Sequence, residues 1–169
     1  MKYYLLLFII LMSLTSIKAQ EKKNEITTYY LIRHAEKNRT ENTNKNPNLT
    51  EKGIKRAKNW SVVFKNIPFD IIYSTNYNRT KQTAEPTAKS KNLKIQYYNP
   101  RDLYNEKFKS KTTGKTVLVV GHSNTTPQLV NKIIGNEKYT DIDDLNNSNL
   151  YIVTIINGQK TTNLLKIEY

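Results

Sequence analysis

Two apolar runs in this chain end alike, each with a histidine placed two residues after it. Residues 29–32 read Tyr-Tyr-Leu-Ile and lead through an arginine to His34, while residues 117–120 read Val-Leu-Val-Val and lead through a glycine to His122. Short apolar runs of this kind predict buried strands of a parallel sheet. Such strands deliver their last residues to one edge of the sheet, where ligands of open α/β proteins bind. We therefore expect both histidines, which are the only 2 in the sequence, at that edge.

Strand-like and helix-like segments alternate through the rest of the chain. Strands are predicted at residues 69–73, 93–98 and 115–121. Helices are predicted from Thr50, from Tyr77, from Arg101 to just before Gly114, and at residues 125–134. Residues 149–156 and 162–169 should form a closing hairpin around Asn157-Gly158. This order predicts an α/β fold, a three-layer α/β/α arrangement with a mainly parallel sheet and an antiparallel C-terminal edge.

Capping and breaking residues give these predicted helices their details. Thr50 is a candidate N-cap of the first helix. Its expected apolar face consists of Ile54, Ala57, Trp60 and Val62. Pro86 should kink or break the second helix. Asn99-Pro100 is a good opening for the third helix, as a cap followed by the first helical residue.

The first 19 residues have the pattern of a secretory signal peptide, with a basic start, an apolar run and a small residue, Ala19, at the cleavage point. An uncleaved membrane anchor is the alternative, but a span needs about 20 apolar residues, and polar residues interrupt this run after Leu11. We therefore predict a signal peptide at residues 1–19 and a single domain at residues 20–169. The protein would be exported to the periplasm or the extracellular space. The sequence contains no cysteine, which excludes disulfides and thiolate metal sites.

The charge of the chain predicts an anionic partner. Lysine and arginine number 27 against 14 acidic residues, a formal net charge of +13. Only five of the 27 are arginines, which leaves 22 scattered lysines. Base recognition favours arginine, so we expect no nucleic-acid partner. An electrostatic binder that stacks bases on Tyr29-Tyr30 and Tyr97-Tyr98 stays open as an alternative, although these tyrosines are more simply strand residues.

Three segments share one layout, in which a strand and a short turn lead to polar residues and then to a helix or loop. They are Arg33-His34, residues 74–79 and Gly121-His122. In a parallel sheet they would meet at one edge, where two arginines, two histidines and helix N-termini would suit a phosphoryl group. Each of these segments also has a purely structural interpretation. A histidine at a strand end can be a hydrogen-bonded core residue, and Arg79 can be a surface residue. The shared position of both histidines favours the site.

These motifs resemble those of the histidine phosphatase superfamily, which includes cofactor-dependent phosphoglycerate mutases and small bacterial phosphohistidine phosphatases. The resemblance covers nearly the whole chain after the signal segment. The matching motifs are residues 30–36, Leu49-Thr50-x-x-Gly53 with Ala57, residues 73–85 and residues 117–122. The chain departs from the family pattern at Ala35, where glycine is usual, and at Ser123-Asn124, where a glycine commonly follows the second histidine.

The resemblance implies a mechanism. His34 would attack phosphorus and become phosphohistidine, while Arg33, Arg79 and His122 hold the phosphoryl oxygens. A carboxylic acid would protonate the leaving oxygen and then activate water. Candidates for this acid are Asp102 first, Glu106 one turn later on the same helix face, and Glu36 third. The candidate substrate-binding residues are Glu36, Ser74, Ser123 and Asn124.

The expected function is that of an exported phosphatase acting on phosphomonoesters or phosphoramidates. The partner would be a phosphorylated small molecule or a phosphoprotein, with no membrane span in the mature chain. No cofactor or metal is expected, because the neighbouring arginines would repel a cation and no helical histidine pair exists. A non-catalytic phosphate-binding module on the same fold is the main alternative. A phosphomutase is less favoured, since the chain has little length for a cap that would exclude water.

Overall fold

Six strands and four helices follow one another in the computed structural model, which describes residues 25–41 and 43–168. In chain order they are β1 (Ile26–Arg33), α2 (Glu51–Val63), β2 (Ile71–Ser74), α3 (Asn78–Ser90), β3 (Ile95–Tyr97), α4 (Glu106–Thr112), β4 (Thr116–Gly121), α5 (Thr125–Ile134), β5 (Asn149–Ile156) and β6 (Gln159–Lys166). The predicted signal peptide lies outside the described residues. Within the described ranges, no helix is both long and apolar enough to cross a membrane.

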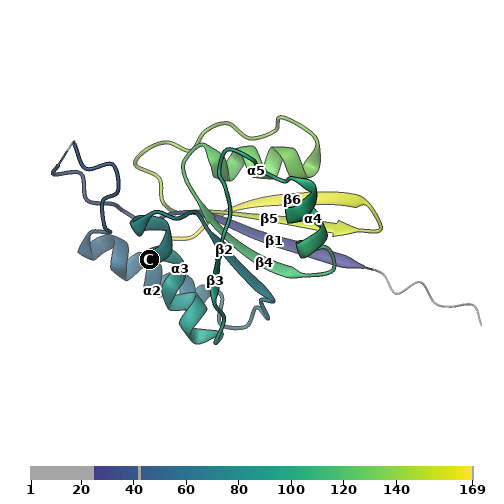
Figure 1. Ribbon diagram of the computed structural model, residues 1–169, viewed down its shortest axis with the longest axis horizontal. Helices are drawn as coiled ribbons and strands as arrows, with labels where there is room; N and C mark the ends of the chain where they lie inside the picture. Colours follow the sequence, from purple (N-terminus) through teal and green to yellow (C-terminus); the bar gives the residue numbers. More distant parts are fainter. Residues whose placement is uncertain (1–24, 42, 169) are drawn as a thin grey trace, which may run out of the picture.

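The strands form one mixed sheet in the order β3-β2-β4-β1-β5-β6 (Figure 1). The first four strands of that order run parallel to one another. The last two join antiparallel at the β1 side. The predicted α/β fold with an antiparallel C-terminal edge is therefore confirmed. Figure 1 shows α2 and α3 on one side of the sheet and α5 on the other.

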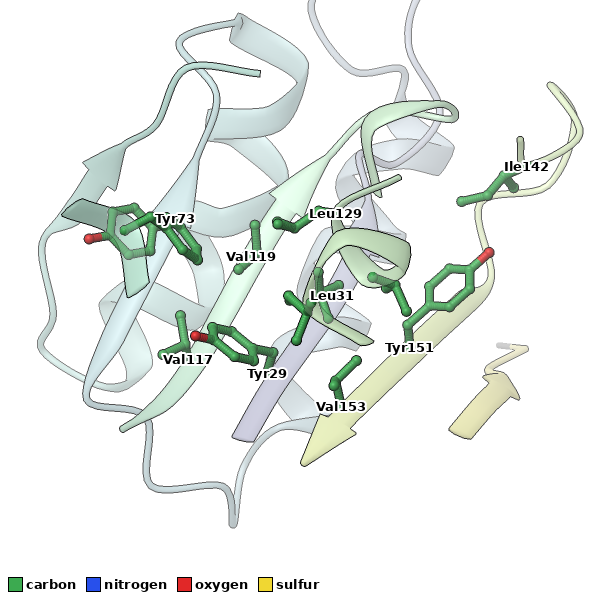
Figure 2. Close-up of a cluster of buried hydrophobic side chains, with 12 residues drawn as sticks. Tyr29, Leu31, Tyr73, Val117, Val119, Leu129, Ile142, Tyr151 and Val153 are labelled. Atoms are coloured by element: carbon green, nitrogen blue, oxygen red, sulfur yellow. The ribbon is translucent and has the colours of Figure 1, made fainter. Parts of the chain in front are cut away.

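Alternate residues of the central strands pack into two separate cores, one on each face of the sheet. In β1, Tyr29 and Leu31 face the core that α4 and α5 cover, while Ile32 faces the core that α2 and α3 cover. Figure 2 shows the first of these cores, where strand residues such as Leu31 and Val119 meet Leu129 of α5. Because both faces are covered, the central strands are apolar throughout, which explains the unbroken apolar runs in the sequence.

Helix α2 begins at the predicted cap and buries Ala57 and Trp60 as predicted, but its buried face excludes the other two predicted residues. Thr50 Oγ1 accepts a hydrogen bond from the Gly53 N–H at 3.1 Å, as an N-cap should. The buried residues of the helix are Gly53, Arg56, Ala57 and Trp60. Ile54 and Val62, which were predicted in the core, are 46% and 67% exposed. The prediction followed hydrophobicity alone, whereas Gly53 and Arg56 are buried because of contacts with the segment after β1.

Helix α3 continues through Pro86 to Ser90, so the predicted break at this proline is wrong. A proline in a helix removes one hydrogen bond, here the one to the Gln82 carbonyl, and crowds the preceding turn. Buried residues lie on both sides of it, with Thr83 and Ala84 before and Thr87 and Ala88 after. Packing against the sheet thus holds both halves in one helix.

Helix α4 begins at Glu106, five residues later than predicted. Asn99 does accept a hydrogen bond from the Arg101 N–H, at 3.0 Å, but it closes an isolated turn. Tyr104 then adopts a left-handed φ of 57°, which no helix from Arg101 could continue through. Asn105 is the actual N-cap and accepts from the Phe108 N–H at 2.8 Å.

The C-terminal hairpin turns on Asn157 and Gly158, as predicted, with left-handed φ values of 50° and 82°. Because this turn has only two residues, β6 begins directly at Gln159, where it pairs with Ile156. The strand predicted at residues 162–169 was therefore placed three residues too late.

Candidate functional site

The ends of β1, β2 and β4 meet at one edge of the sheet. Arg33 is paired with Gly121, and Ser74 with Val120. The His34 N–H extends the parallel ladder by donating to the Gly121 carbonyl at 3.0 Å. The rings of His34 and His122 lie edge to face with centroids 5.6 Å apart. The two histidines therefore face each other across neighbouring strand ends, as their shared position in the sequence predicted.

Hydrogen bonds to the main chain fix His34. Its Nδ1 lies 2.7 Å from the Ala35 carbonyl, an atom that can only accept, so Nδ1 carries the proton and Nε2 keeps its lone pair. The His34 carbonyl accepts from Asn147 Nδ2 at 2.8 Å. Burial, reinforced by the charges of Arg33 and Arg79, lowers the pKa of His34 to about 3. The imidazole is consequently neutral at neutral pH.

Thr83 of α3 holds the peptide that follows His34. Its Oγ1 accepts from the Ala35 N–H at 2.9 Å and donates to the Arg79 carbonyl at 2.7 Å. The carbonyl of that same Ala35 is the acceptor of the His34 ring. One threonine thus connects the first turn of α3 to the residue that sets the tautomer of His34.

Side chains surround His122. Its Nε2 lies 2.9 Å from Thr75 Oγ1, and its Nδ1 lies 3.5 Å from Arg79 Nη2. The Tyr77 ring stands edge to face with the imidazole, with centroids 5.2 Å apart. Burial lowers the pKa of His122 to about 4, with further contributions from Arg79, Arg33 and Lys37. This ring is also neutral at neutral pH.

Arg33 is buried and bound to the loop at residues 143–146. Its Nη1 donates to the carbonyls of Asp143, Asp144 and Asn146 at 2.8, 3.1 and 2.9 Å. Its Nη2 donates to the Asp144 carboxylate at 2.6 Å. The other oxygen of that carboxylate accepts from Arg39 Nη1, also at 2.6 Å. The hydrogen bond from Arg39, with that from Arg33, holds the pKa of Asp144 well below its usual range.

The Arg79 guanidinium stacks on the Tyr77 ring. Its guanidinium carbon lies 4.6 Å from the centre of the Tyr77 ring. Its Nε is buried and has no hydrogen-bond partner in the described part of the chain, and the same holds for Nε of Arg33. A buried N–H without an acceptor is costly, so two of them on cations beside the histidines indicate a place for an anion.

Glu36 connects the segment after β1 to α2. Both of its carboxylate oxygens accept from Arg56 Nε at 3.0 Å, and one also accepts from Nη2 at 2.9 Å. Its carbonyl accepts from the Thr50 N–H at 2.9 Å. A Cβ on Gly53 would lie 2.2 Å from that carbonyl oxygen, so the close approach requires glycine. The Leu-Thr-x-x-Gly motif therefore has a structural reason, and the Glu36 carboxylate is occupied by Arg56.

The other three predicted substrate-binding residues lie at the end of β2 or just after β4 and make local contacts. Ser74 is buried and donates to the Thr75 carbonyl at 2.8 Å. The Ser123 carbonyl accepts from the Ile142 N–H at 2.8 Å. Asn124 caps α5 and accepts from the Thr125 N–H at 2.9 Å.

The predicted acids lie apart from the histidines. The exposed Asp102 carboxylate accepts from Asn105 Nδ2 at 2.7 Å, and Glu106 accepts from Lys109 Nζ at 2.6 Å. The charged side chains that shift the pKa values of His34 and His122 are all cationic. The structure therefore brings Arg33, His34, Arg79 and His122 together, and it leaves the first two candidate acids, Asp102 and Glu106, outside this group.

Sequence reasoning missed five residues of the site. Thr75 lies in the turn after β2, which was noted only as polar, and Tyr77 was noted only as the start of a helix. Asp144 and Asn147 lie in a loop without a motif. Thr83 had a usable signal, since a threonine four residues after Arg79 lies on the same face of a helix. Within residues 25–41 and 43–168, no three His, Asp or Glu side chains gather in a group that could hold a metal ion.

Comparisons with known proteins show which family this chain resembles. Residues 29–99 match the model of the histidine phosphatase superfamily (branch 1). A search of curated protein sequences finds no match.

Solved structures share the fold at low sequence identity. The protein histidine phosphatase SixA complexed with tungstate is 18% identical, with a TM-score of 0.67 over 82% of this chain and 96% of that one. A phosphoglycerate mutase from Bacillus anthracis str. Sterne is 17% identical, with a TM-score of 0.66 over 86% and 95%. The alpha-ribazole phosphatase from Shigella flexneri is 16% identical, with a TM-score of 0.63 over 83% and 96%. This chain is therefore similar to the histidine phosphatase superfamily (branch 1) over residues 29–99, and it shares its fold with these solved structures.

Proposed function

We propose that this protein is a phosphatase that hydrolyses phosphomonoesters or phosphoramidates through a phosphohistidine intermediate on His34. The observation that carries the proposal is the state of that side chain. The Ala35 carbonyl occupies Nδ1, burial keeps the ring neutral, and the Nε2 lone pair is left for attack on phosphorus. The similarity of residues 29–99 to the histidine phosphatase superfamily, and the fold shared with a protein histidine phosphatase, support the same chemistry.

The anion would lie between the two histidines and the two arginines. Nε of Arg33 and Nε of Arg79 are buried donors that need an acceptor, and a phosphoryl oxygen would supply one. His122 lies beside both His34 and Arg79. Arg33, Arg79 and His122 would hold the phosphoryl oxygens and stabilise the charge of the transition state. The tungstate in the SixA structure, a tetrahedral oxyanion, supports a site of this type.

The reaction would proceed in two displacements. Nε2 of His34 forms a bond to phosphorus while the bond from phosphorus to the leaving oxygen or nitrogen breaks, and the leaving atom keeps the bonding pair and takes a proton from solvent. Water then attacks phosphorus, the phosphorus–nitrogen bond breaks, and phosphate and neutral His34 are released. The proton that the water loses passes to the phosphate or to solvent. Asp102, Glu106 and Glu36 are the sequence's candidates for the acid, but the first two are exposed and Glu36 is bound by Arg56. Aryl phosphates, whose phenolate leaving groups need little protonation, fit this arrangement best, and a phosphoramidate fits when its nitrogen has taken up a proton from solvent.

The decisive test replaces the nucleophile. In the wild-type protein, intact-mass spectrometry during turnover of an aryl phosphate should reveal an acid-labile adduct of one phosphoryl group, mapped to His34. His34→Ala should abolish both adduct and turnover, with an unchanged circular dichroism spectrum as the control for folding. Comparable turnover by His34→Ala would falsify the proposal.

A non-catalytic phosphate-binding module remains the second candidate, because the charged groups that act on both histidines are cations and no acid is among them. Release of one leaving group per chain, followed by no further release, would support the module. Steady release over many equivalents would support the phosphatase.

Export is part of the proposal and depends on residues 1–19 alone. The natural partner would then be a phosphorylated small molecule or a phosphoprotein in the periplasm or outside the cell. The mature protein from secreting cells should begin at Gln20, which N-terminal sequencing can establish. A protein that keeps Met1 in those cells would argue against export by a cleaved signal.

A further inference from the structure

Two buried threonines stand behind His122, on the side away from Arg79. Thr75 Oγ1 lies 2.9 Å from Nε2 of His122 and 2.9 Å from Thr80 Oγ1. Both threonine side chains are fully buried. The three side chains therefore form one hydrogen-bonded chain whose two hydroxyl groups are closed to water, so each hydroxyl hydrogen must have a defined direction.

Thr80, at the end of this hydrogen-bonded chain away from His122, determines the direction of the hydroxyl hydrogens. Thr80 Oγ1 lies 2.9 Å from the carbonyl oxygens of Thr75 and Tyr77, and a carbonyl oxygen can only accept. The single hydroxyl hydrogen of Thr80 is therefore directed at these carbonyls. Thr75 must then donate to Thr80 Oγ1 and accept from Nε2–H of His122. The proton of neutral His122 is thus placed on Nε2.

The contact between His122 and Arg79 independently favours the same tautomer. Nδ1 of His122 lies 3.5 Å from Arg79 Nη2, and a guanidinium nitrogen can only donate. An Nδ1 without a proton suits this neighbour, whereas an Nδ1–H would point a hydrogen at a cation. An acceptor on the Nε2 side of the ring, Thr75 Oγ1, and a donor on the Nδ1 side, Arg79 Nη2, therefore select one tautomer.

We propose that Thr75, with its direction fixed by Thr80, is a positioning residue that holds neutral His122 as the Nε2–H tautomer. The lone pair of Nδ1 then faces Arg79 and the space between the histidines. The charged groups acting on this ring are Arg79, Arg33 and Lys37, all of them cations that keep Nδ1 unprotonated. A phosphoryl dianion in that space would draw a proton from solvent onto Nδ1, and His122 would then donate to Thr75 and to a phosphoryl oxygen at once. This last consequence rests on the proposed function, but the tautomer does not.

The sequence makes the tautomer directly measurable. Because it contains only 2 histidines, ¹⁵N-labelled imidazoles give two ring systems in NMR, and His34→Asn leaves His122 alone. At neutral pH the wild-type His122 should show a protonated Nε2 and an unprotonated Nδ1. Thr75→Val should convert much of it to the Nδ1–H form, since Nε2–H then has no buried acceptor. Thr75→Ser should keep the wild-type spectrum.

Thr80→Val tests the direction of the chain rather than the contact itself. It leaves the Thr75 hydroxyl in place but frees its hydrogen to turn toward Nε2, so the Nδ1–H tautomer should gain population. A structural role of Thr80 in packing would not change the tautomer. Thr80→Val also serves if Thr75→Val does not fold.

Turnover of an aryl phosphate supplies the second measurement. We expect Thr75→Val to lower kcat/KM by about tenfold, mainly through kcat, and Thr75→Ser to restore it to within about twofold. A wild-type Nδ1–H tautomer, or spectra that Thr75→Val and Thr80→Val leave unchanged, would overturn the assignment. An altered tautomer with full activity would overturn its catalytic consequence. A wild-type protein inactive toward all phosphate compounds would overturn the proposed function instead, while the spectra still decide the tautomer.

Discussion

The ends of β1 and β4 each present one histidine, of which His34 is buried and His122 is partly exposed, and the two strand ends hold their histidines by different means. At the end of β1, main-chain atoms surround His34, with the Ala35 carbonyl on the ring and the Gly121 carbonyl on the peptide. At the end of β4, side chains surround His122, with Thr75 on one nitrogen and Arg79 on the other.

This difference teaches where the site tolerates change. A carbonyl cannot be removed by substitution, so the tautomer of the proposed nucleophile is a property of the fold. The tautomer of His122 depends on hydroxyl groups that a single substitution can delete. We expect the β4 end to be the adjustable half of the site and the β1 end to be the constant half.

The largest expected effect, which the two ends share, is a loss of stability in acid. Both folded pKa values, about 3 for His34 and about 4 for His122, lie below the ordinary value of 6.5. The unfolded chain therefore binds more protons below pH 6.5, and stability falls on acidification, by about 1.4 kcal/mol per pH unit for each histidine. This loss continues down to about pH 4 for His122 and about pH 3 for His34.

Urea unfolding in steps of pH from 6.5 to 4 can measure these contributions. His34→Asn and His122→Asn should each reduce the slope of stability against pH by about 1.4 kcal/mol per unit, because each removes one histidine from the balance. If the variants keep the wild-type slope of unfolding free energy against pH, the two imidazoles are not buried and neutral in the folded protein, and the comparison of the two strand ends fails.

A smaller effect tests whether the orientation of His34 at the end of β1 depends on main-chain atoms alone. Thr83 accepts the Ala35 N–H, so Thr83→Val should leave that buried N–H without a partner and loosen the peptide that orients His34. We expect kcat/KM to fall by about tenfold and the free energy of unfolding by about 1–3 kcal/mol.

Thr87→Val is the matched control for this change. Thr87 lies one turn further along the same helix and is buried, but its hydroxyl has no partner among the described residues. The same substitution there should leave kcat/KM unchanged and stability equal or higher. Equal losses in both variants would mean that Thr83 acts through packing and not through the Ala35 peptide.

The smallest expected effect concerns the acids that the sequence suggested. Asp102 is exposed and bound to Asn105, and Glu106 is exposed and paired with Lys109. Asp102→Asn and Glu106→Gln should therefore keep kcat for an aryl phosphate within about twofold of the wild type. A loss of a hundredfold or more in either variant, measured with an unchanged melting temperature, would restore that carboxylate as the proton donor.

The fold was predictable because its signals are repeated along the chain. Apolar runs gave the central strands, Asn157-Gly158 gave the hairpin turn, and Gly135 gave the end of α5 with a left-handed φ of 75°. The failures have local causes that lie in tertiary contacts. Pro86 is tolerated because both sides of α3 are packed, and Ile54 is exposed because the Glu36 carbonyl and carboxylate select Gly53 and Arg56 for the buried face.

The histidine pair was predictable for a similar reason, since strand order alone brings the ends of β1 and β4 together. The groups around it were not. Thr75 contacts a residue 47 positions away, and Asp144 one 111 positions away, across turns without a periodic pattern. Such contacts are set by how loops pack over the sheet, which no local spacing encodes.

The four hydrogen bonds that immobilise the Arg33 guanidinium have a consequence for affinity. Ordering a free arginine side chain costs about 2 kcal/mol of rotamer entropy, and here folding has already met that cost. A tetrahedral anion would find its cation rigid on arrival. Under the proposed function, liberated phosphate gains from this preorganisation as much as a substrate does. Product inhibition is then built into the site, and hydrolysis would slow wherever inorganic phosphate is abundant.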